Sequence, residues 1–190
     1  MKKIFLCVFL LFAFIGTVLA DENSEIEKFI DSFSVEFEKI SKLGSQGDKE
    51  RATYNLANKI LDLNWMSNFI LGKSRNDFDD KTKKEFVEYY SKSLIRNYIS
   101  FVDSYKKENY KILNIEKKKE NLFMVSTTIK LQDKEVNNSF RITKKGNNYY
   151  ITDVIVEGVS FISSQRSEIG SIISSGKFNE FMEKIKTESK

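Results

Sequence analysis

The sequence predicts an α+β domain in which a four-stranded, twisted antiparallel sheet packs against N-terminal and C-terminal helices. Two observations support this class. Apolar residues recur at three- and four-residue steps before residue 110 and again after residue 158, which is the periodicity of amphipathic helices. Between these positions apolar and polar residues alternate, which is the periodicity of strands.

The beginning of the chain has the pattern of a secretory signal peptide. Two lysines precede an apolar run over residues 4–15, and small residues lead up to Ala20. The run is short for a helix that must cross ~30 Å of hydrocarbon, so we expect cleavage after Ala20 rather than a retained anchor. Cys7, the only cysteine, lies inside the apolar run, which argues against a lipoprotein.

Cleavage would leave residues 21–190 as a single domain. Its formal net charge falls from +4 to +2 when Lys2 and Lys3 are removed, so bulk charge does not indicate a nucleic-acid partner. The chain has no histidine, which excludes Ser-His-Asp and Cys-His nucleophilic sites and histidine-containing zinc sites. Carboxylate, lysine, tyrosine or cofactor chemistry remains possible, but without histidine and, after cleavage, without cysteine we expect no metal site.

Three helices are expected before the sheet, over residues 24–43, 48–71 and 80–106, the third with Asp79 or Asp80 as its N-cap. The latter part of the second helix is apolar on most sides, so it forms either core or the wall of a cavity. After the sheet, a helix is expected from Ser160 as N-cap to Gly176, followed by a short last helix.

Four strands are expected over residues 110–117, 121–131, 135–144 and 149–156. Short connections between them favour an antiparallel meander. The apolar residues on one face are Phe123, Val125, Thr127, Ile129 and Leu131 of the second strand and Val136, Phe140 and Ile142 of the third. The fourth strand is apolar on both faces, with Tyr149, Ile151 and Ile155 opposite Tyr150, Val154 and Val156.

Three blocks of sequence resemble the MlaC family, also known as the toluene-tolerance periplasmic component. The first is residues 150–161, a strand with Asp-Val and a Glu-Gly-Val-Ser turn, followed by Arg166 and Ser167. The second is Leu71-Gly72 followed by Phe86 and a long aromatic helix, and the third is residues 176–179. The chain departs from the family pattern at Ser74-Arg75-Asn76, where an aromatic residue and an arginine are usual, and at Lys177, which replaces a glycine.

The resemblance implies a monomeric periplasmic carrier with a deep apolar cavity between the twisted sheet and the helices. Such a carrier moves phospholipid between an outer-membrane lipoprotein complex and an inner-membrane ABC transporter complex, and so maintains the lipid asymmetry of the outer membrane. Such a carrier binds lipid, needs no cofactor and catalyses nothing.

On this interpretation we expect the lipid to contact one residue of the second helix, one face of the sheet and one arginine. These residues are Phe69, Val125, Thr127, Ile129, Phe140, Ile142, Val154, Val156 and Arg166. Thr127 is included because a polar residue between Val125 and Ile129 is unusual in a close-packed core, and indicates a space filled by ligand.

Arg166 falls within the apolar stripe formed by Ile162, Ile169 and Ile173 on its helix. We expect a buried or half-buried ion pair with Asp153 or Glu157; the alternative is contact with a phosphate headgroup at the mouth of the cavity.

Two other classes of protein fit the same pattern of elements. A cone-shaped α+β fold of the nuclear-transport-factor type would make the chain a small-ligand receptor or an enzyme, and a polar ligand or turnover would identify it. A structural interaction module would have no cavity. A bound phospholipid would favour the carrier.

Overall fold

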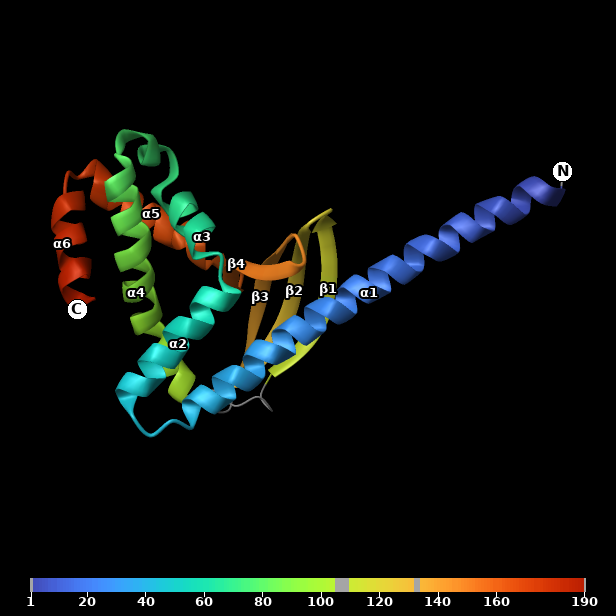
Figure 1. The fold of residues 1–190 in the computed structure, drawn as a ribbon, viewed down its shortest axis with the longest axis horizontal. Coiled ribbons are helices and arrows are strands. Elements are labelled where there is room, and N and C mark those ends of the chain that lie inside the picture. The colour runs from blue at the N-terminus through green and yellow to red at the C-terminus, as the bar shows by residue number, and fades with distance from the viewer. Residues whose placement is uncertain (1, 105–109, 132–133, 190) are drawn as a thin grey trace.

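The computed structural model describes the backbone of residues 2–104, 110–131 and 134–189, and the side chains of residues 22–96, 110–130 and 134–189. Four α-helices precede the sheet in these residues: α1 (Lys2–Ser41), α2 (Gln46–Ile60), α3 (Leu63–Leu71) and α4 (Asp80–Ser104), with a short 3₁₀ helix, η1 (Gly72–Asp77), before α4. Two helices, α5 (Phe161–Ser174) and α6 (Phe178–Glu188), follow it (Figure 1). The predicted α+β class is confirmed.

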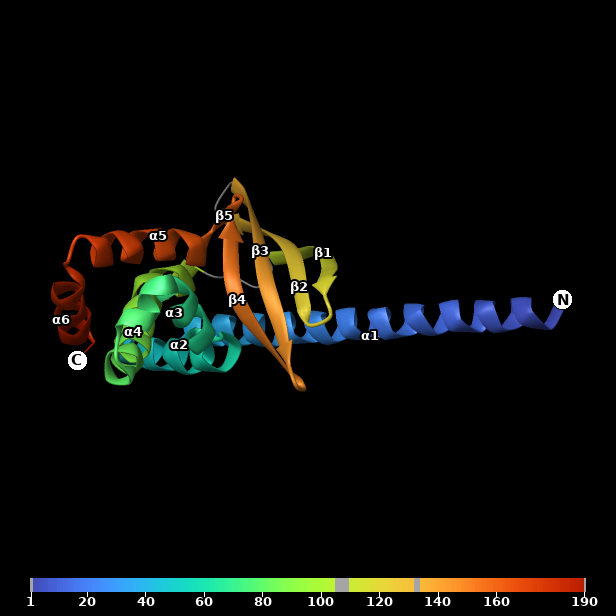
Figure 2. The same cartoon turned by 90° about the horizontal axis from the view of Figure 1, so that it is seen from above.

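The sheet is an antiparallel meander with the strand order β1-β2-β3-β4-β5 (Figure 2). The first four strands are β1 (Tyr110–Lys119), β2 (Leu122–Leu131), β3 (Lys134–Lys145) and β4 (Asn148–Val156), close to the predicted limits. A fifth strand, β5 (Val159–Ser160), was not predicted. The turn before it contains Glu157 and Gly158, both with positive φ, and two residues are too few to show an alternating pattern.

The second predicted helix is wrong as a single element, because it divides into α2 and α3. Leu61 is extended, and Asp62 donates its backbone N–H to the carbonyl of Ile151. The Asp62 side chain then accepts a hydrogen bond from the N–H of Trp65, which caps the start of α3. The break therefore joins the helices to β4. The predicted end of the third helix at Lys106 lies outside the described residues.

A β-bulge in β4 changes which of its residues share a face. Arg141 pairs with Asp153 but the next residue of β3, Ile142, pairs with Ile151, so Thr152 is the extra residue. The alternation read from the sequence placed Ile151 and Val154 on opposite faces. This was wrong: the bulge brings Ile151 and Val154 to the face that carries Ile142 and Phe140, their partners on β3.

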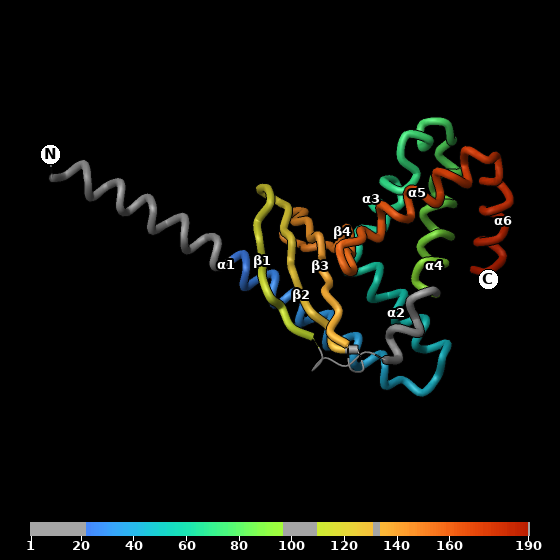
Figure 3. Tube along the Cα trace, turned by 180° about the vertical axis from the view of Figure 1, so that it is seen from behind, coloured from blue at the N-terminus to red at the C-terminus, as the bar shows by residue number. Residues whose placement is uncertain are grey.

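The protein has two apolar cores, one on each side of the α2–α3 break. In the first core, Ile26, Ile30 and Phe33 of α1 pack against Phe123 and Ile142 of the sheet. Figures 1 and 2 both show α1 running along one face of the sheet. In the second core, helices α3 to α6 pack together around a set of buried side chains, among them Ile70, Phe86, Ile162, Ile169 and Phe178. In Figure 3, α5 runs from the end of the sheet to α6, which lies beyond α3 and α4.

Ion pairs connect α1 to the tips of the sheet. The carboxylate of Glu25 accepts hydrogen bonds from the Tyr149 hydroxyl at 2.7 Å and from Lys144 Nζ at 3.1 Å, and Glu22 pairs with Lys117 at 2.6 Å. The Tyr149 hydrogen bond and the nearby Lys144 ammonium lower the pKa of Glu25 below its ordinary value. The hydrogen bonds to Tyr149 and Glu25 raise the pKa of Lys144.

Candidate functional site

A cavity of about 410 Å³ lies between the two cores. Its walls come from α1 to α5 and from β1 to β4. The lining residues are Phe33, Ser34, Phe37, Thr53, Ala57, Ile60, Leu61, Met66, Leu94, Ile95, Tyr110, Ile129, Val136, Asn138, Phe140, Ile151, Val154, Val156 and Phe161. The two cores thus leave between them a space to which nearly every element contributes.

The chemistry of this cavity suits hydrocarbon. Most lining side chains are aliphatic or aromatic, and no described lining residue carries a formal charge. The volume falls within the range of roughly 300–1,000 Å³ usual for ligand pockets, which are apolar with a few placed polar groups. Val156, at one edge of the cavity, is exposed, so the apolar wall continues to the surface of the protein.

Four of the residues predicted from the sequence to contact lipid lie in the cavity wall: Ile129, Phe140, Val154 and Val156. Val125 and Ile142 are fully buried in the core between α1 and the sheet and do not line the cavity. Thr127 is 1% exposed and does not line it either. Its hydroxyl donates to the carbonyl of Asn138 at 3.2 Å, so it is held within the sheet beside a lining residue.

Phe69 and Arg166 lie away from the cavity, on the outer side of α3 and α5. The rings of Trp65 and Phe69 stack with centroids 5.3 Å apart, and the Arg166 guanidinium lies 4.9 Å from the centre of the Phe69 ring. Gly72 has a φ of +60°, and a Cβ there would come within 2.9 Å of the Arg166 guanidinium. Glycine at position 72 therefore allows the arginine to lie flat over this turn.

The predicted ion pair of Arg166 with Asp153 or Glu157 is wrong. Arg166 is exposed, and among the described residues no carboxylate lies within ion-pair distance of it. Asp153 instead pairs with Arg141 at 3.5 Å, and the carboxylate of Glu157 accepts a hydrogen bond from the backbone N–H of Asn137. The aromatic ring of Phe69 takes the place of a carboxylate as the partner of Arg166.

The contribution of α1 and α2 to the cavity was not predicted. Phe33 and Phe37 line it from α1, and Ala57 and Ile60 line it from α2. Two hydroxyl residues, Ser34 and Thr53, belong to the same two surfaces. A signal was present in the sequence, because Ile30, Phe33, Ser34 and Phe37 share one helical stripe, as do Thr53, Leu56, Ala57 and Ile60.

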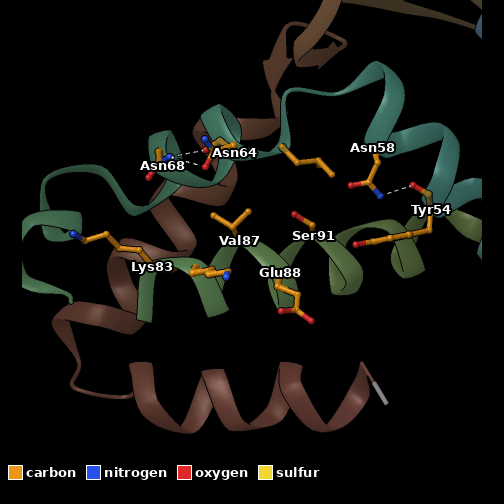
Figure 4. Close-up of a pocket in the computed structure, with 10 residues that line it drawn as sticks. Tyr54, Asn58, Asn64, Asn68, Lys83, Val87, Glu88 and Ser91 are labelled. Carbon is orange, nitrogen blue, oxygen red and sulfur yellow. Dashed lines mark hydrogen bonds between the residues drawn. The ribbon is translucent and has the colours of Figure 1, made fainter. Parts of the chain in front are cut away.

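Two further hollows are more polar than this cavity. One, of about 450 Å³ between α2, α3 and α4, is lined by Asn58, Asn64, Asn68, Lys83, Lys84 and Glu88 among others (Figure 4). Asn58 and Asn68 donate to the helix carbonyls of Tyr54 and Asn64 at 2.7 and 2.8 Å. The other, of about 500 Å³, lies between α1, α2 and the β3–β4 hairpin. Both include charged and amide side chains in their walls, so they suit hydrocarbon less well than the uncharged cavity does.

Within the described part of the chain, no three His, Cys, Asp or Glu side chains gather closely enough to hold a metal ion. The helices of the same described residues include none with the length and apolar character needed to cross a bilayer.

The sequence matches a known protein family. A protein-family model described as MlaC protein matches residues 29–187. Comparison with curated protein sequences gives no match.

Among solved structures, the fold is similar to that of the phospholipid-binding protein from Ralstonia solanacearum, which was solved in complex with a phospholipid. The TM-score is 0.70 at 13% sequence identity, over 87% of this chain and 97% of the other. At this identity the comparison shows a shared fold.

Proposed function

The chain belongs to the MlaC family, and from this premise we propose that it is an exported phospholipid-binding protein that carries lipid across the periplasm. In this proposal it accepts and delivers phospholipid between an outer-membrane lipoprotein complex and an inner-membrane ABC transporter complex, as a monomer, and maintains the lipid asymmetry of the outer membrane. The observation that carries the proposal is the uncharged apolar cavity between the sheet and the helices.

The physical need for such a cavity follows from the cost of hydrating acyl chains. Each methylene transferred from hydrocarbon to water costs about 0.8 kcal/mol, so two chains with about 30 methylenes would cost roughly 25 kcal/mol. A cavity walled by Phe33, Phe37 and Phe140 provides apolar surroundings throughout the transfer. The family and the fold relative likewise favour a binding protein over an enzyme.

Export is the second part of the proposal, with cleavage after Ala20. The remaining helix would keep its anchors, because Ile26 and Ile30 are fully buried against the sheet and Glu22 pairs with Lys117. N-terminal sequencing of periplasmic protein should begin at Asp21. A full-length, membrane-embedded product would contradict export.

Transfer of a diacyl phospholipid between donor and acceptor vesicles tests the carrier function. Mature wild-type protein should accelerate the transfer, and Val156→Trp, which fills the exposed edge of the cavity, should slow it severalfold. Val159→Trp is the matched control, because Val159 is 62% exposed and does not line the cavity. Transfer no faster than in buffer would contradict the proposal, as would turnover of a polar ligand.

A further inference from the structure

A patch of aromatic and cationic side chains lies at the surface of α3 and α5. It consists of Trp65, Phe69 and Arg166, and we call it the Trp65 patch. The Trp65 and Phe69 rings stack with centroids 5.3 Å apart, and the Arg166 guanidinium lies 4.9 Å from the centre of the Phe69 ring. None of the three residues lines the lipid cavity. The patch is therefore a second feature of the molecule, separate from the cavity.

The charges at and beside the Trp65 patch are mostly positive. Arg166 is exposed and forms no ion pair with a described carboxylate. Lys73 and Arg75, in η1 directly after α3, are exposed and likewise form no ion pair with a described residue, while Asp77 stands at the far end of η1. α3 carries no charged side chain, and Glu168 of α5 accepts a hydrogen bond from Gln165. The cations are thus left available to an anion from outside the protein.

Trp65 is the exposed end of the patch. It is 38% exposed, and its indole N–H has no acceptor among the described residues. Tryptophan is enriched at the interface between membrane and water, where the ring lies in apolar surroundings and the N–H reaches polar groups. Arginine binds phosphate groups well, and basic side chains are attracted to anionic lipid surfaces. The patch therefore combines the two kinds of side chain that anchor proteins at a bilayer surface.

We propose that the Trp65 patch docks the protein on an anionic phospholipid bilayer. The inference rests on the proposed function, because a phospholipid carrier must approach a membrane to exchange its lipid, and it adds the face that makes this approach. Charge complementarity carries the proposal: the lipid phosphates supply the acceptors that Arg166 lacks, and the interfacial region takes up the indole. The same two helices line the cavity through Met66 and Phe161, so docking holds the cavity beside the bilayer.

Trp65 is the only tryptophan in the chain, so its fluorescence reports directly on the patch. Mature protein is mixed with vesicles of phosphatidylcholine alone or of phosphatidylcholine and phosphatidylglycerol in equal parts. With the anionic vesicles we expect the emission to shift to shorter wavelength and to be quenched by brominated acyl chains, and we expect high salt to reverse both effects. Arg166→Gln should weaken binding to these vesicles about fivefold, the contribution of one basic side chain at such a surface.

Arg51→Gln is the matched control, because it removes the same charge from an exposed arginine of α2 that pairs with Asp48, and it should bind vesicles as wild type does. Circular dichroism shows whether both variants are folded. An unshifted emission overturns the bilayer as the occupant and leaves the patch to a protein partner. An equal shift with both vesicle compositions, or equal weakening by the two substitutions, also overturns the inference.

The vesicle experiment separates this inference from the proposed function. Lipid transfer by a protein whose Trp65 emission does not respond to vesicles overturns docking through the patch alone. Docking by a protein that does not accelerate lipid transfer would support the patch and contradict the carrier function.

Discussion

At the scale of single residues, Asp153 connects three parts of the fold from a fully buried position. Its carboxylate accepts hydrogen bonds from the Ser160 hydroxyl at 2.7 Å and from the backbone N–H of Ile162 at 3.2 Å, and it pairs with Arg141. It therefore caps the N-terminus of α5 from the neighbouring strand β4, where a negative charge also complements the helix dipole. We expect this contact to anchor the start of α5 on β4.

Asp153→Ala should lower the free energy of unfolding by about 2–4 kcal/mol, because it leaves the Ile162 N–H and the half-buried Arg141 without their acceptor. Urea denaturation measures the change. Asp77→Ala, at an exposed position in η1, is the control and should change the free energy of unfolding by less than about 0.5 kcal/mol. Equal effects of the two substitutions would show that Asp153 does not anchor α5.

Arg166→Ala tests the contact between the guanidinium and the Phe69 ring. Because the site is exposed, the substitution should lower the free energy of unfolding by only about 0.5–1 kcal/mol. The bound lipid should be unchanged, since Arg166 does not line the cavity. Loss of bound lipid at an unchanged melting temperature would instead assign Arg166 to the headgroup.

Single residues also show where the sequence is informative about the site. Ile129, Phe140, Val154 and Val156 could be chosen because they are apolar and lie on strands. Ser34 and the other lining residues of α1 and α2 were missed, because an apolar stripe on a helix has the same sequence pattern whether it faces packed side chains or a cavity. The contact of Arg166 was predicted wrongly because the periodicity of a helix shows which residues share a face, but not which element that face contacts.

At the scale of elements, Glu25 ties α1 to the β3–β4 hairpin through Lys144 and Tyr149. These contacts lower its pKa in the folded protein below the ordinary value of 4.5. A carboxylate with a lowered folded pKa stabilises the fold above its unfolded pKa, and this contribution disappears as the pH falls through the folded pKa.

The difference in melting temperature between wild type and Glu25→Gln should therefore be present at pH 7, begin to shrink as the pH drops below about 5, and vanish in stronger acid. Differential scanning calorimetry over this range measures it. Glu27→Gln, on the exposed side of α1, is the matched control and should lower the melting temperature little at any pH. A difference for Glu25→Gln that grows with acidity would contradict the assigned sign.

The elements that the sequence predicted well have local causes. The strands alternate, and their hairpins contain polar or glycine turns, so β1 to β4 fall close to the expected limits. Ser160 caps α5 as expected, with its hydroxyl accepting from Ser163 N–H. The break at Leu61 and the bulge at Thr152 were missed because both depend on pairing with another strand. Asp62 bonds to Ile151 of β4, and Arg141 of β3 pairs with Asp153 of β4.

At the scale of the whole molecule, the cavity follows from having two cores instead of one. The first core joins α1 and α2 to the sheet, and the second joins α3 to α6. Leu61, at the α2–α3 break, packs against both cores and also lines the cavity. No local pattern encodes such a space, because its walls come from segments as distant as Phe33 and Phe161.

The central claim is that this cavity holds the acyl chains of a phospholipid, and native mass spectrometry of the mature protein tests it most directly. Wild type, purified from cells, should carry an additional mass that corresponds to one phospholipid. Val154→Trp, which places an indole in the cavity, should lose most of it while remaining folded, and the exposed control Val159→Trp should retain it. A folded Val154→Trp variant with its full complement of lipid, or a wild-type protein that carries none, would contradict the account.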